Sequence, residues 1–294
     1  MVRRGTTDDP HGTMLPMTLV NELLDSLSRA LSRFKAPRVR ALHLPPARWD
    51  GSKDGEFGAI ELEDGSLGLS YVLLDATLSA LASRGHGQDV IGADAMDVAR
   101  WWAHGDGARR TLGFAAVNAL TRHLFDRVGF APPDATDSIG GLDPQPGEHI
   151  GMIGFFPPLV KQVTACGARL TVLELKPELA GERPAFRITL DPRELDACDK
   201  VLSTSTVLLN DTLDAVLSHC ARARAFAMIG PGASCLPDAL FKRGVTVMGG
   251  AWIEEPERFK RALAAGDPWG GHARKFALDR ENYPGIDALL AKVA

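Results

Sequence analysis

The chain has 294 residues, 45% of them hydrophobic and 24% charged, and its formal net charge is -4. This composition is ordinary for a globular protein, and the length favours two domains. The sequence lacks both the clustered Lys and Arg of a broad nucleic-acid surface and the run of about 20 apolar residues that spans a bilayer, so we expect neither partner. Residues 1–17 contain two arginines but no apolar core, so we interpret them as a leader and not as a secretory signal.

The N-terminal part is predicted to be an α+β unit with one hairpin and several helices. Apolar residues recur at helical spacing from Leu19 to Phe34, which indicates an amphipathic helix. Asp64 and Gly65 stand between two apolar runs, which is the strongest short hairpin signal. Strands are predicted over residues 39–44, 57–62 and 67–74, and helices over 19–34, 76–83, 93–103 and 110–125.

Proline and glycine crowd residues 132–147, which indicates a linker without regular structure. Beyond it, strands alternate with helices at a spacing that predicts a doubly wound parallel sheet. The strands are predicted over 150–153, 170–175, 201–202, 226–229 and 245–248, and the helices over 159–165, 192–198, 212–220, 237–242 and 256–265. The predicted fold class is α/β, with an α+β domain over residues 17–131, a parallel-sheet domain over 148–266, and a tail over 267–294 that packs on the domains.

The densest polar cluster follows the third predicted strand of this sheet. Open parallel sheets bind ligands at the carboxyl ends of their strands, so we expect a site here. Asn210 or Asp211 is expected to cap the next helix, but one cap does not need six polar residues, and the surplus indicates a hydrogen-bonding ligand site. Gly230-Pro231-Gly232 closes the next strand in the same way, with glycines that allow close backbone approach. The cluster comprises Thr204, Ser205, Thr206, Asn210, Asp211 and Thr212.

The turn after the first strand of the sheet only partly matches a dinucleotide-binding turn. It contains Gly154 but lacks the third glycine of G-x-G-x-x-G, and Phe155, Phe156 and two prolines occupy it. The two rings either stack on a flat ligand or pack at the sheet edge. Glu174 follows Gly154 by about 20 residues, the spacing at which dinucleotide folds place the acid that binds a ribose. The alternative is a carboxylate that is solvated or paired with Lys176.

Metal-ligand spacing is absent from the sequence, because no C-x-x-C or H-x-x-x-H pair occurs. Cys235, on a strand-end loop, is the one candidate metal ligand, although burial as a small apolar side chain is the favoured interpretation. The wide spacing of the four cysteines predicts reduced thiols and a cytoplasmic protein. On the last predicted N-terminal helix, Gly113 indicates close helix packing, and Asn118 is a polar residue that could face a cleft between the domains.

Several of these motifs resemble one family. Residues 204–212 resemble the strand-end motif T-G-T-T-L-V-N-G-T of the heavy-metal-chelation family, with Ser205 in place of the first glycine. Residues 230–232 are similar to the later glycine-proline turn of that family. The helix from Gly113 to Asn118 is loosely similar to its G-x-x-x-x-x-N pattern.

The resemblance covers most of the chain from about Asn21 and is strongest over residues 150–266. It implies an enolase-N-terminal-like domain followed by a Rossmann-like domain, with a site between the two. It also implies heavy-metal chelation or handling, in which the cleft binds a small ligand: a heavy-metal ion, a metal complex or a metal-chelating metabolite. The residues expected to bind it are Gly154, Phe155, Phe156, Glu174, Thr204, Thr206, Asn210, Thr212, Gly230, Pro231 and Asn118.

Two alternatives stay open at this point. The first is an enzyme that uses a nucleotide-type cofactor, S-adenosylmethionine or NAD, with Glu174 on the ribose. The second is a structural or regulatory homodimer. In either case a metal is expected to be held through a ligand or by groups from both domains, because a closed cage takes four Cys or His side chains with at least one short spacing.

Overall fold

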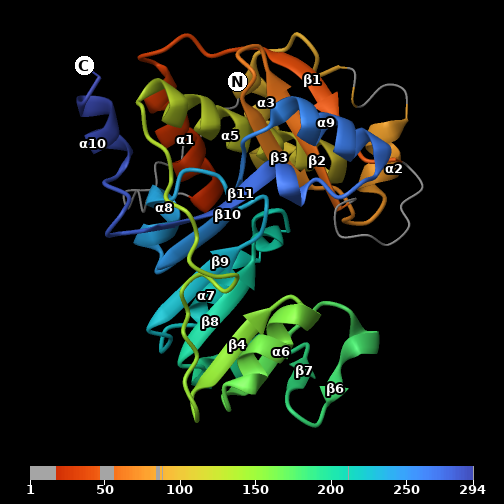
Figure 1. Ribbon diagram of the computed structural model, residues 1–294, viewed down its shortest axis with the longest axis vertical. Coiled ribbons are helices and arrows are strands. Elements are labelled where there is room, and N and C mark those ends of the chain that lie inside the picture. The colour runs from red at the N-terminus through yellow and green to blue at the C-terminus, as the bar shows by residue number, and fades with distance from the viewer. Residues whose placement is uncertain (1–17, 47–55, 84–86, 88, 211, 294) are drawn as a thin grey trace, which may run out of the picture.

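The computed structural model describes residues 18–46, 56–83, 87, 89–210 and 212–293. The leader interpreted at residues 1–17 and the candidate cap Asp211 lie outside the described residues. The molecule is elongated, with the N-terminal helices and a small sheet at one end and a larger sheet that runs to the other (Figure 1). Within the described ranges, no helix has the length and apolar character needed to cross a bilayer.

A three-stranded antiparallel sheet lies in the N-terminal half. Its strands, in spatial order, are β1 (Val39–His43), β2 (Phe57–Leu62) and β3 (Leu67–Tyr71). The hairpin predicted from Asp64 and Gly65 is confirmed, because β2 and β3 pair antiparallel and Gly65 takes φ +90°, which costs glycine little. The helices of this half are α1 (Leu19–Leu31), α2 (Thr77–Ala82), α3 (Ala95–Ala99), α4 (Trp101–His104) and α5 (Gly107–Arg127).

The long helix α5 packs on β2 and β3 and closely approaches α4. A Cβ atom on Gly113 would stand 2.2 Å from the backbone nitrogen of Trp102, so only glycine allows this approach. The close helix-packing face predicted at Gly113 is therefore confirmed. Trp102 is fully buried, and its Nε1 donates to the carbonyl of Leu208 at 2.8 Å, which ties α4 to the C-terminal half.

A hydrogen bond between Asp64 and His123 fixes the hairpin turn to α5. Asp64 Oδ2 accepts from His123 Nδ1 at 2.5 Å, and the same carboxylate accepts from the backbone nitrogen and hydroxyl of Ser66, each at 3.0 Å. Burial alone would raise the pKa of Asp64, but the hydrogen bonds from His123 and Ser66 outweigh burial and lower the pKa to about 2. The ionised carboxylate therefore favours the folded state.

We expect Asp64→Asn to lower the free energy of unfolding at neutral pH by about 1 kcal/mol, a figure discounted because the Asp64 side chain is 36% exposed. A lowered carboxyl pKa adds stability above the unfolded value of 3.8 and loses it as the pH falls toward about 2. When unfolding is measured in urea, the difference in the free energy of unfolding between wild type and variant should therefore shrink below about pH 4. A gap that stays constant down to about pH 3 would contradict this assignment.

The predicted linker at residues 132–147 is a strap along the large sheet. Its prolines and glycines exclude helix and strand there, as predicted. Ile139 and Leu142 nevertheless anchor the strap, because both side chains are buried in the core of the C-terminal half. The carboxylate of Asp137 accepts from the backbone nitrogens of Ile139 and Gly141, each at 2.9 Å, which fixes the turn between them.

The C-terminal half contains an eight-stranded sheet. Its strands are β4 (His149–Ile153), β5 (Arg169–Leu173), β6 (Gly181–Glu182), β7 (Arg187–Thr189), β8 (Lys200–Thr204), β9 (Ala225–Ile229), β10 (Val247–Ile253) and β11 (Ala273–Asp279). Their spatial order is β11-β10-β9-β8-β4-β5-β7-β6, and all neighbours pair parallel except the two edge strands, β11 and β6. A small antiparallel sheet followed by a large, mostly parallel sheet confirms the predicted α/β fold class.

Helices and short 3-10 turns connect these strands. The α-helices are α6 (Pro157–Ala165), α7 (Leu213–Ser218), α8 (Asp238–Lys242), α9 (Pro256–Ala265) and α10 (Ile286–Ala291). The 3-10 turns are η2 (Pro177–Leu179), η3 (Pro192–Ala197), η4 (Ser205–Leu208) and η5 (Gly270–His272). The helix predicted at 192–198 is thus wrong in type, since η3 is a 3-10 helix.

The sequence does not predict β6, β7 or β11. The first two have only two and three residues, too few for an alternating pattern to be visible. In contrast, β11 has seven residues and pairs with the whole of β10. The tail expected over residues 267–294 therefore supplies one edge of the large sheet, while the domain boundaries themselves stay a prediction.

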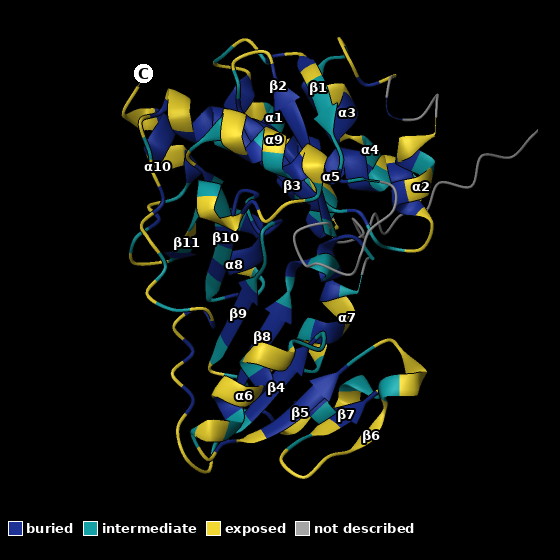
Figure 2. Ribbon diagram, turned by 45° about the vertical axis from the view of Figure 1, so that its right-hand side comes forward, coloured by how far each residue is buried: buried dark blue, intermediate teal, exposed yellow. Residues whose placement is uncertain are grey.

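One hydrophobic cluster runs through both halves of the molecule. It includes Leu23 of α1 and Leu120 of α5, both fully buried, and continues to Val201, Phe226 and Met228 on one face of the large sheet. A second cluster lies between the other face and α6. Strands that are buried on both faces are typical of a parallel sheet covered by helices. Figure 2 shows buried residues along β4, β8 and β9, in the middle of the sheet.

The helix α9 follows β10 and returns to the small sheet. Its Phe259 and Leu263 are completely buried in a cluster with Phe57 and Leu69 of the β2–β3 hairpin. A segment of the C-terminal half therefore supplies part of the core of the N-terminal half. Burial of two large side chains of this kind stabilises the contact by roughly 1.5–3 kcal/mol each.

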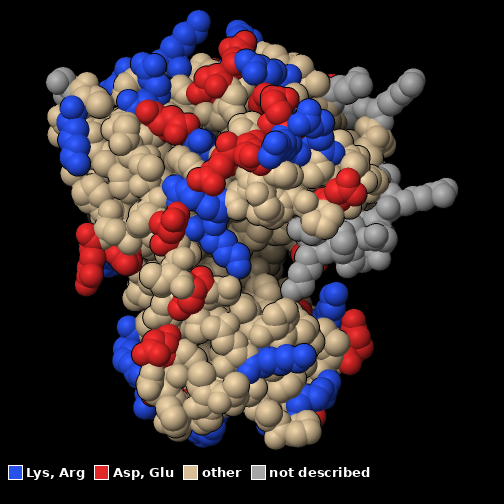
Figure 3. Space-filling view, viewed as in Figure 1, with Lys and Arg blue, Asp and Glu red and all other residues tan. Residues whose placement is uncertain are grey.

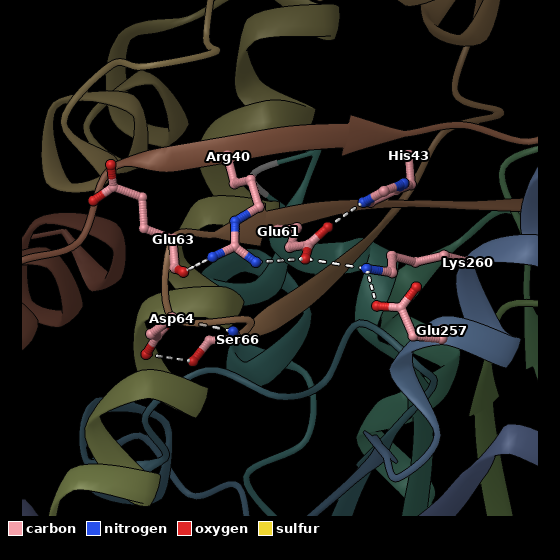
Figure 4. Close-up of polar contacts among 8 residues, drawn as sticks. All are labelled: Arg40, His43, Glu61, Glu63, Asp64, Ser66, Glu257 and Lys260. Carbon is pink, nitrogen blue, oxygen red and sulfur yellow. Dashed lines mark hydrogen bonds and ion pairs between the residues drawn. The ribbon is translucent and has the colours of Figure 1, made fainter.

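Polar and charged side chains also hold α9 to β1 and β2 of the small sheet, and Glu61 of β2 lies at their centre (Figure 4). Its side chain is 6% exposed, and its carboxylate accepts from His43 Nε2 at 2.8 Å, Lys260 Nζ at 3.1 Å and an Arg40 guanidinium nitrogen at 3.3 Å. Burial favours the neutral acid, but the hydrogen bonds from His43 and Lys260 outweigh it and hold the pKa of Glu61 below its usual value.

Candidate functional site

The carboxyl ends of β4 and β8 meet at the switch point of the large sheet. β4 lies between β5 and β8, so the chain leaves β4 toward one side of the sheet and later returns on the other. Open parallel sheets bind ligands in the crevice that such a reversal creates. Gly154 and Thr204 lie here: a Cβ atom on Gly154, whose φ is +87°, would stand 3.2 Å from Thr204 Cγ2. Folding thus joins two of the predicted site residues.

The polar cluster after β8 forms a local hydrogen-bond network. The hydroxyl oxygens of Thr204 and Thr206 lie 3.1 Å apart, and the Thr206 backbone nitrogen donates to Thr204 Oγ1 at 3.3 Å. Asn210 Oδ1 accepts from the hydroxyl of Thr212 at 2.6 Å and from its backbone nitrogen at 3.3 Å. The prediction that Asn210 caps the next helix is wrong, because α7 begins after Thr212 and the Asn210 side chain closes the preceding turn instead.

Part of this cluster stays available to a ligand. Thr204, Thr206 and Asn210 are each half-buried, and the Asn210 amide nitrogen donates to no atom of the described residues. In the hydrogen bond between the two threonine hydroxyls only one of them donates, so the proton of the other is left for a further hydrogen bond. The surface therefore offers hydroxyl and amide groups that a polar ligand could engage.

The loop after β9 closes beside this cluster. A Cβ atom on Gly230, whose φ is +138°, would stand 2.8 Å from Ser205 Oγ, so the loop needs glycine at this position. Pro231 is half-buried next to it, and its carbonyl accepts from Ser234 Oγ at 3.3 Å. Gly230 and Pro231 therefore lie at the same sheet edge as the predicted threonines.

Asn118 connects the small sheet to the same loop. Its amide nitrogen donates to the carbonyls of Leu69 at 2.7 Å and Gly232 at 2.9 Å, while its Oδ1 is buried without a partner among the described residues. Asn118 also lines a cavity of about 10 Å³, together with Arg122 and Trp252. This volume is at the lower limit for one water molecule. Asn118 thus connects the two halves of the molecule, and the small cavity that it lines is bordered by residues of both. Its predicted role in ligand binding stays a prediction.

Glu174, predicted as a possible ribose ligand, fixes the turn after β4. Its Oε2 accepts from the backbone nitrogen of Phe155 at 3.1 Å, and its Oε1 accepts from that of Leu175 at 2.7 Å. Each carboxylate oxygen therefore accepts from a backbone amide, in place of the pairing with Lys176 that the sequence left open. A ribose at this position would have to share an oxygen that already accepts a hydrogen bond.

Tyr71 at the end of β3 is a residue of this edge that the sequence does not predict. Burial raises the pKa of its phenol, and the carboxylates of Glu56 and Glu174 raise it further. The phenol therefore keeps its proton at neutral pH. No local signal could reveal this, because Tyr71 and Glu174 are far apart in the sequence.

The rings of Phe155 and Phe156 are both half-buried at the sheet edge. Phe155 stacks on Phe186, with ring centroids 6.0 Å apart and an angle of 22° between the planes. Phe156 lies beside Gly154, where an added Cβ would stand 3.5 Å from its ring. Packing at the edge, one of the two interpretations from the sequence, thus accounts for part of each ring, while stacking on a ligand stays a prediction.

All four cysteines are free thiols, and three of them are buried. Cys235 is 1% exposed, and burial raises the pKa of its thiol to about 12. Burial likewise raises the pKa values of Cys198 and Cys220 to about 12. Without a metal these thiols stay protonated at neutral pH, and a metal would have to displace the proton in order to bind. In the part of the chain that the structure describes, no three His, Cys, Asp or Glu side chains are grouped so that they could hold a metal ion.

Two family models match this chain, DUF364 over residues 137–280 and DUF4213 over residues 56–121, and both are described as "Putative heavy-metal chelation". The chain belongs to the heavy-metal-chelation family that these two models describe. An uncharacterized protein of Methanocaldococcus jannaschii is 28% identical over 183 residues, which make up 60% of this chain and 68% of that relative. The family descriptions suggest heavy-metal chelation, in agreement with the resemblance of the strand-end motif.

Two solved structures of DUF364 family proteins with unknown function are similar in fold. One, from Desulfitobacterium hafniense, has a TM-score of 0.64 and 17% sequence identity and covers 87% of this chain and 98% of its own. The other, from Pyrococcus horikoshii, has a TM-score of 0.63 and 18% identity and covers 89% of this chain and 100% of its own. At this identity the likeness concerns the fold alone.

The charged residues are mixed in sign on the face shown in Figure 3. Lys and Arg alternate there with Asp and Glu over the upper part of the molecule.

Proposed function

We propose that the protein acts in the cytoplasm and binds a small metal-chelating molecule, or the metal complex of one, at the strand-end site. This site is the surface formed by Gly154, Phe155, Phe156, Glu174, Thr204, Thr206, Asn210, Thr212, Gly230 and Pro231. The observation that carries the proposal is the approach of Gly154 to Thr204 at the switch point, with the paired hydroxyls of Thr204 and Thr206 beside it. The family descriptions of heavy-metal chelation support the metal part of the proposal.

The chemistry of the available groups favours a chelate over a bare ion. Threonine hydroxyls and an asparagine amide form hydrogen bonds with the oxygen and nitrogen atoms of an organic molecule. Soft heavy metals instead select thiolate and imidazole ligands. Among the described residues no three His, Cys, Asp or Glu side chains are grouped to hold a metal ion, and three of the four thiols are buried, so the protein would leave most of the metal coordination to the chelator.

A nucleotide-type cofactor has weaker support. The turn after β4 lacks the third glycine of the dinucleotide pattern, and Phe155 to Pro158 occupy the place of a phosphate-binding turn. Glu174 already accepts two backbone hydrogen bonds. The same sheet edge would still suit S-adenosylmethionine better than NAD, because that cofactor has no pyrophosphate to bind.

Removing one polar group of the cluster at a time, a hydroxyl or an amide, tests the proposal. We expect Thr206→Ala and Asn210→Ala to weaken the binding of a Ni²⁺ chelate about tenfold each, while stability falls by about 1 kcal/mol. The probes are Ni²⁺ alone and its one-to-one complexes with ethylenediamine and with 1,10-phenanthroline, measured by calorimetry. Wild type should bind at least one complex more tightly than it binds Ni²⁺ alone.

Ser218→Ala is the matched control, because its exposed hydroxyl donates only to the carbonyl of Ala215 in α7. This variant should bind the chelate like wild type. If Thr206→Ala and Asn210→Ala fold and bind the chelates unchanged, the polar cluster is structural and the proposal is wrong. Tight binding of NAD that Glu174→Ala weakens would instead favour the nucleotide alternative.

A further inference from the structure

The loop after β8, which carries the polar cluster of the strand-end site, is held from the N-terminal half of the molecule. Trp102 of α4 donates from its indole Nε1 to the carbonyl of Leu208 at 2.8 Å, and the two residues are 0% and 2% exposed. Leu208 is the last residue of η4, which begins directly after Thr204 and contains Thr206. Asn210 follows two residues later. One buried hydrogen bond therefore fixes the middle of the polar cluster.

The Trp102 side chain is itself held in place by α5. A Cβ atom on Gly113 would stand 2.2 Å from the backbone nitrogen of Trp102, so the two helix backbones are in close contact. The ring of Phe114 packs on the indole, with centroids 5.0 Å apart. The indole N–H is the only polar group of this side chain. A movement of the loop away from it would leave the carbonyl of Leu208 without this partner, which is unfavourable at a buried position.

The loop after β9 is held from the same helix. The Asn118 amide nitrogen of α5 donates to the carbonyl of Gly232 at 2.9 Å. This loop also packs against the start of η4, since a Cβ atom on Gly230 would stand 2.8 Å from Ser205 Oγ. The two loops that form the polar side of the strand-end site therefore share one support, the helix pair α4 and α5.

We propose that Trp102 is a positioning residue of the strand-end site. Because it is 0% exposed, it acts through the loop: it holds the Thr206 hydroxyl and the Asn210 amide at the spacing that the ligand needs. This inference rests on the proposed function and adds a residue of the N-terminal half that sets the affinity of the site. Binding groups must be held to within about 0.5 Å, and packed side chains with buried hydrogen bonds provide such support.

Trp102→Phe tests the inference, because it keeps an aromatic ring in α4 and removes the indole N–H. The first measurement is hydrogen exchange of the Leu209 amide, which donates to the carbonyl of Thr206 at 2.9 Å. Its exchange should become about tenfold faster, because the loop opens more often without its support. The second measurement is calorimetry with the one-to-one Ni²⁺ complexes of ethylenediamine and 1,10-phenanthroline. The affinity of the folded variant for the complex that wild type binds should fall about tenfold.

Two variants serve as controls. Trp101→Phe makes the same change at the neighbouring residue of α4, whose half-buried ring lies under the guanidinium of Arg109 at 5.2 Å. It should keep both the exchange and the affinity of wild type. Leu289→Ala removes a buried side chain of α10, so it should lower the stability of the protein and leave both readouts unchanged. A role of Trp102 in stability alone would make Trp102→Phe behave like Leu289→Ala.

The inference is wrong if either the exchange of the Leu209 amide or the affinity stays at its wild-type value in Trp102→Phe. Equal losses of affinity in Leu289→Ala also overturn it, since general stability would then set the affinity. If wild type binds neither complex, the proposed function fails, and the exchange measurement still decides whether Trp102 holds the loop. Should Trp102→Phe not fold, Phe114→Leu takes its place, because it removes the ring that packs on the indole, and the same two changes are expected.

Discussion

Replacing Gly68 with valine should lower the free energy of unfolding by about 3 kcal/mol or more. Gly68 is the second residue of β3, where a Cβ atom would stand 2.1 Å from the backbone nitrogen of Ala119 and 2.2 Å from the carbonyl oxygen of Ala115. Both atoms belong to the backbone of α5, which cannot move aside as a flexible side chain would. The strand and the helix would therefore have to separate, and the apolar contact between them would be lost.

Urea unfolding of the variant measures this loss, or a failure to fold demonstrates it. Gly270→Ala is the control, because an added Cβ meets no atom within 4 Å there and the stability should change by less than about 0.5 kcal/mol. A Gly68→Val protein within 1 kcal/mol of wild type would mean that α5 and β3 do not pack as closely as described.

Glu61→Ala should be the second most damaging change, with a loss of about 2–3 kcal/mol. The carboxylate is 6% exposed and meets three basic groups. Its removal leaves His43 Nε2 without its acceptor and leaves Lys260, which is 17% exposed, with only the exposed Glu257 as a counter-charge. Because Lys260 belongs to α9, the loss should also loosen this helix from the small sheet. Hydrogen exchange should become faster in α9 than in α6, which makes no contact with Glu61.

The control for this prediction shares a partner with Glu61. Glu257 also pairs with Lys260, at 2.7 Å, but its side chain is 77% exposed. Exposed ion pairs contribute little, so Glu257→Ala should cost no more than about 0.5 kcal/mol. Equal losses in the two variants would show that burial of Glu61 does not decide the strength of the network.

The sequence was most informative where a local rule determines the structure. The Asp64-Gly65 pair predicts the β2–β3 hairpin because the turn depends on a backbone conformation that glycine adopts readily. The prolines and glycines of residues 132–147 predict the strap because they exclude regular hydrogen bonding. The helix predicted over 93–103 is in fact two helices, α3 and α4, which adjoin at Arg100. No local residue marks that division.

The candidate site could be predicted only in part. Parallel strands present their carboxyl ends at one edge, so the positions of Gly154, Thr204 and Gly230 follow from the order of strands and helices. The roles of Glu174 and Asn118 do not, because their hydrogen bonds join segments that are distant in sequence. Tyr71 went unnoticed for the same reason.

Native mass spectrometry with elemental analysis of freshly purified protein tests the central claim most directly. The account predicts that any bound heavy metal is accompanied by the mass of an organic chelator, and that both are released together when the protein is denatured. Removal of the metal should leave the thermal unfolding of the protein unchanged, unlike in small domains that fold around a metal. A stoichiometric metal that remains after gel filtration without any organic mass, and whose removal unfolds the protein, would contradict the account. Loss of that metal in Cys235→Ser would then identify a thiolate ligand at the residue that the structure buries.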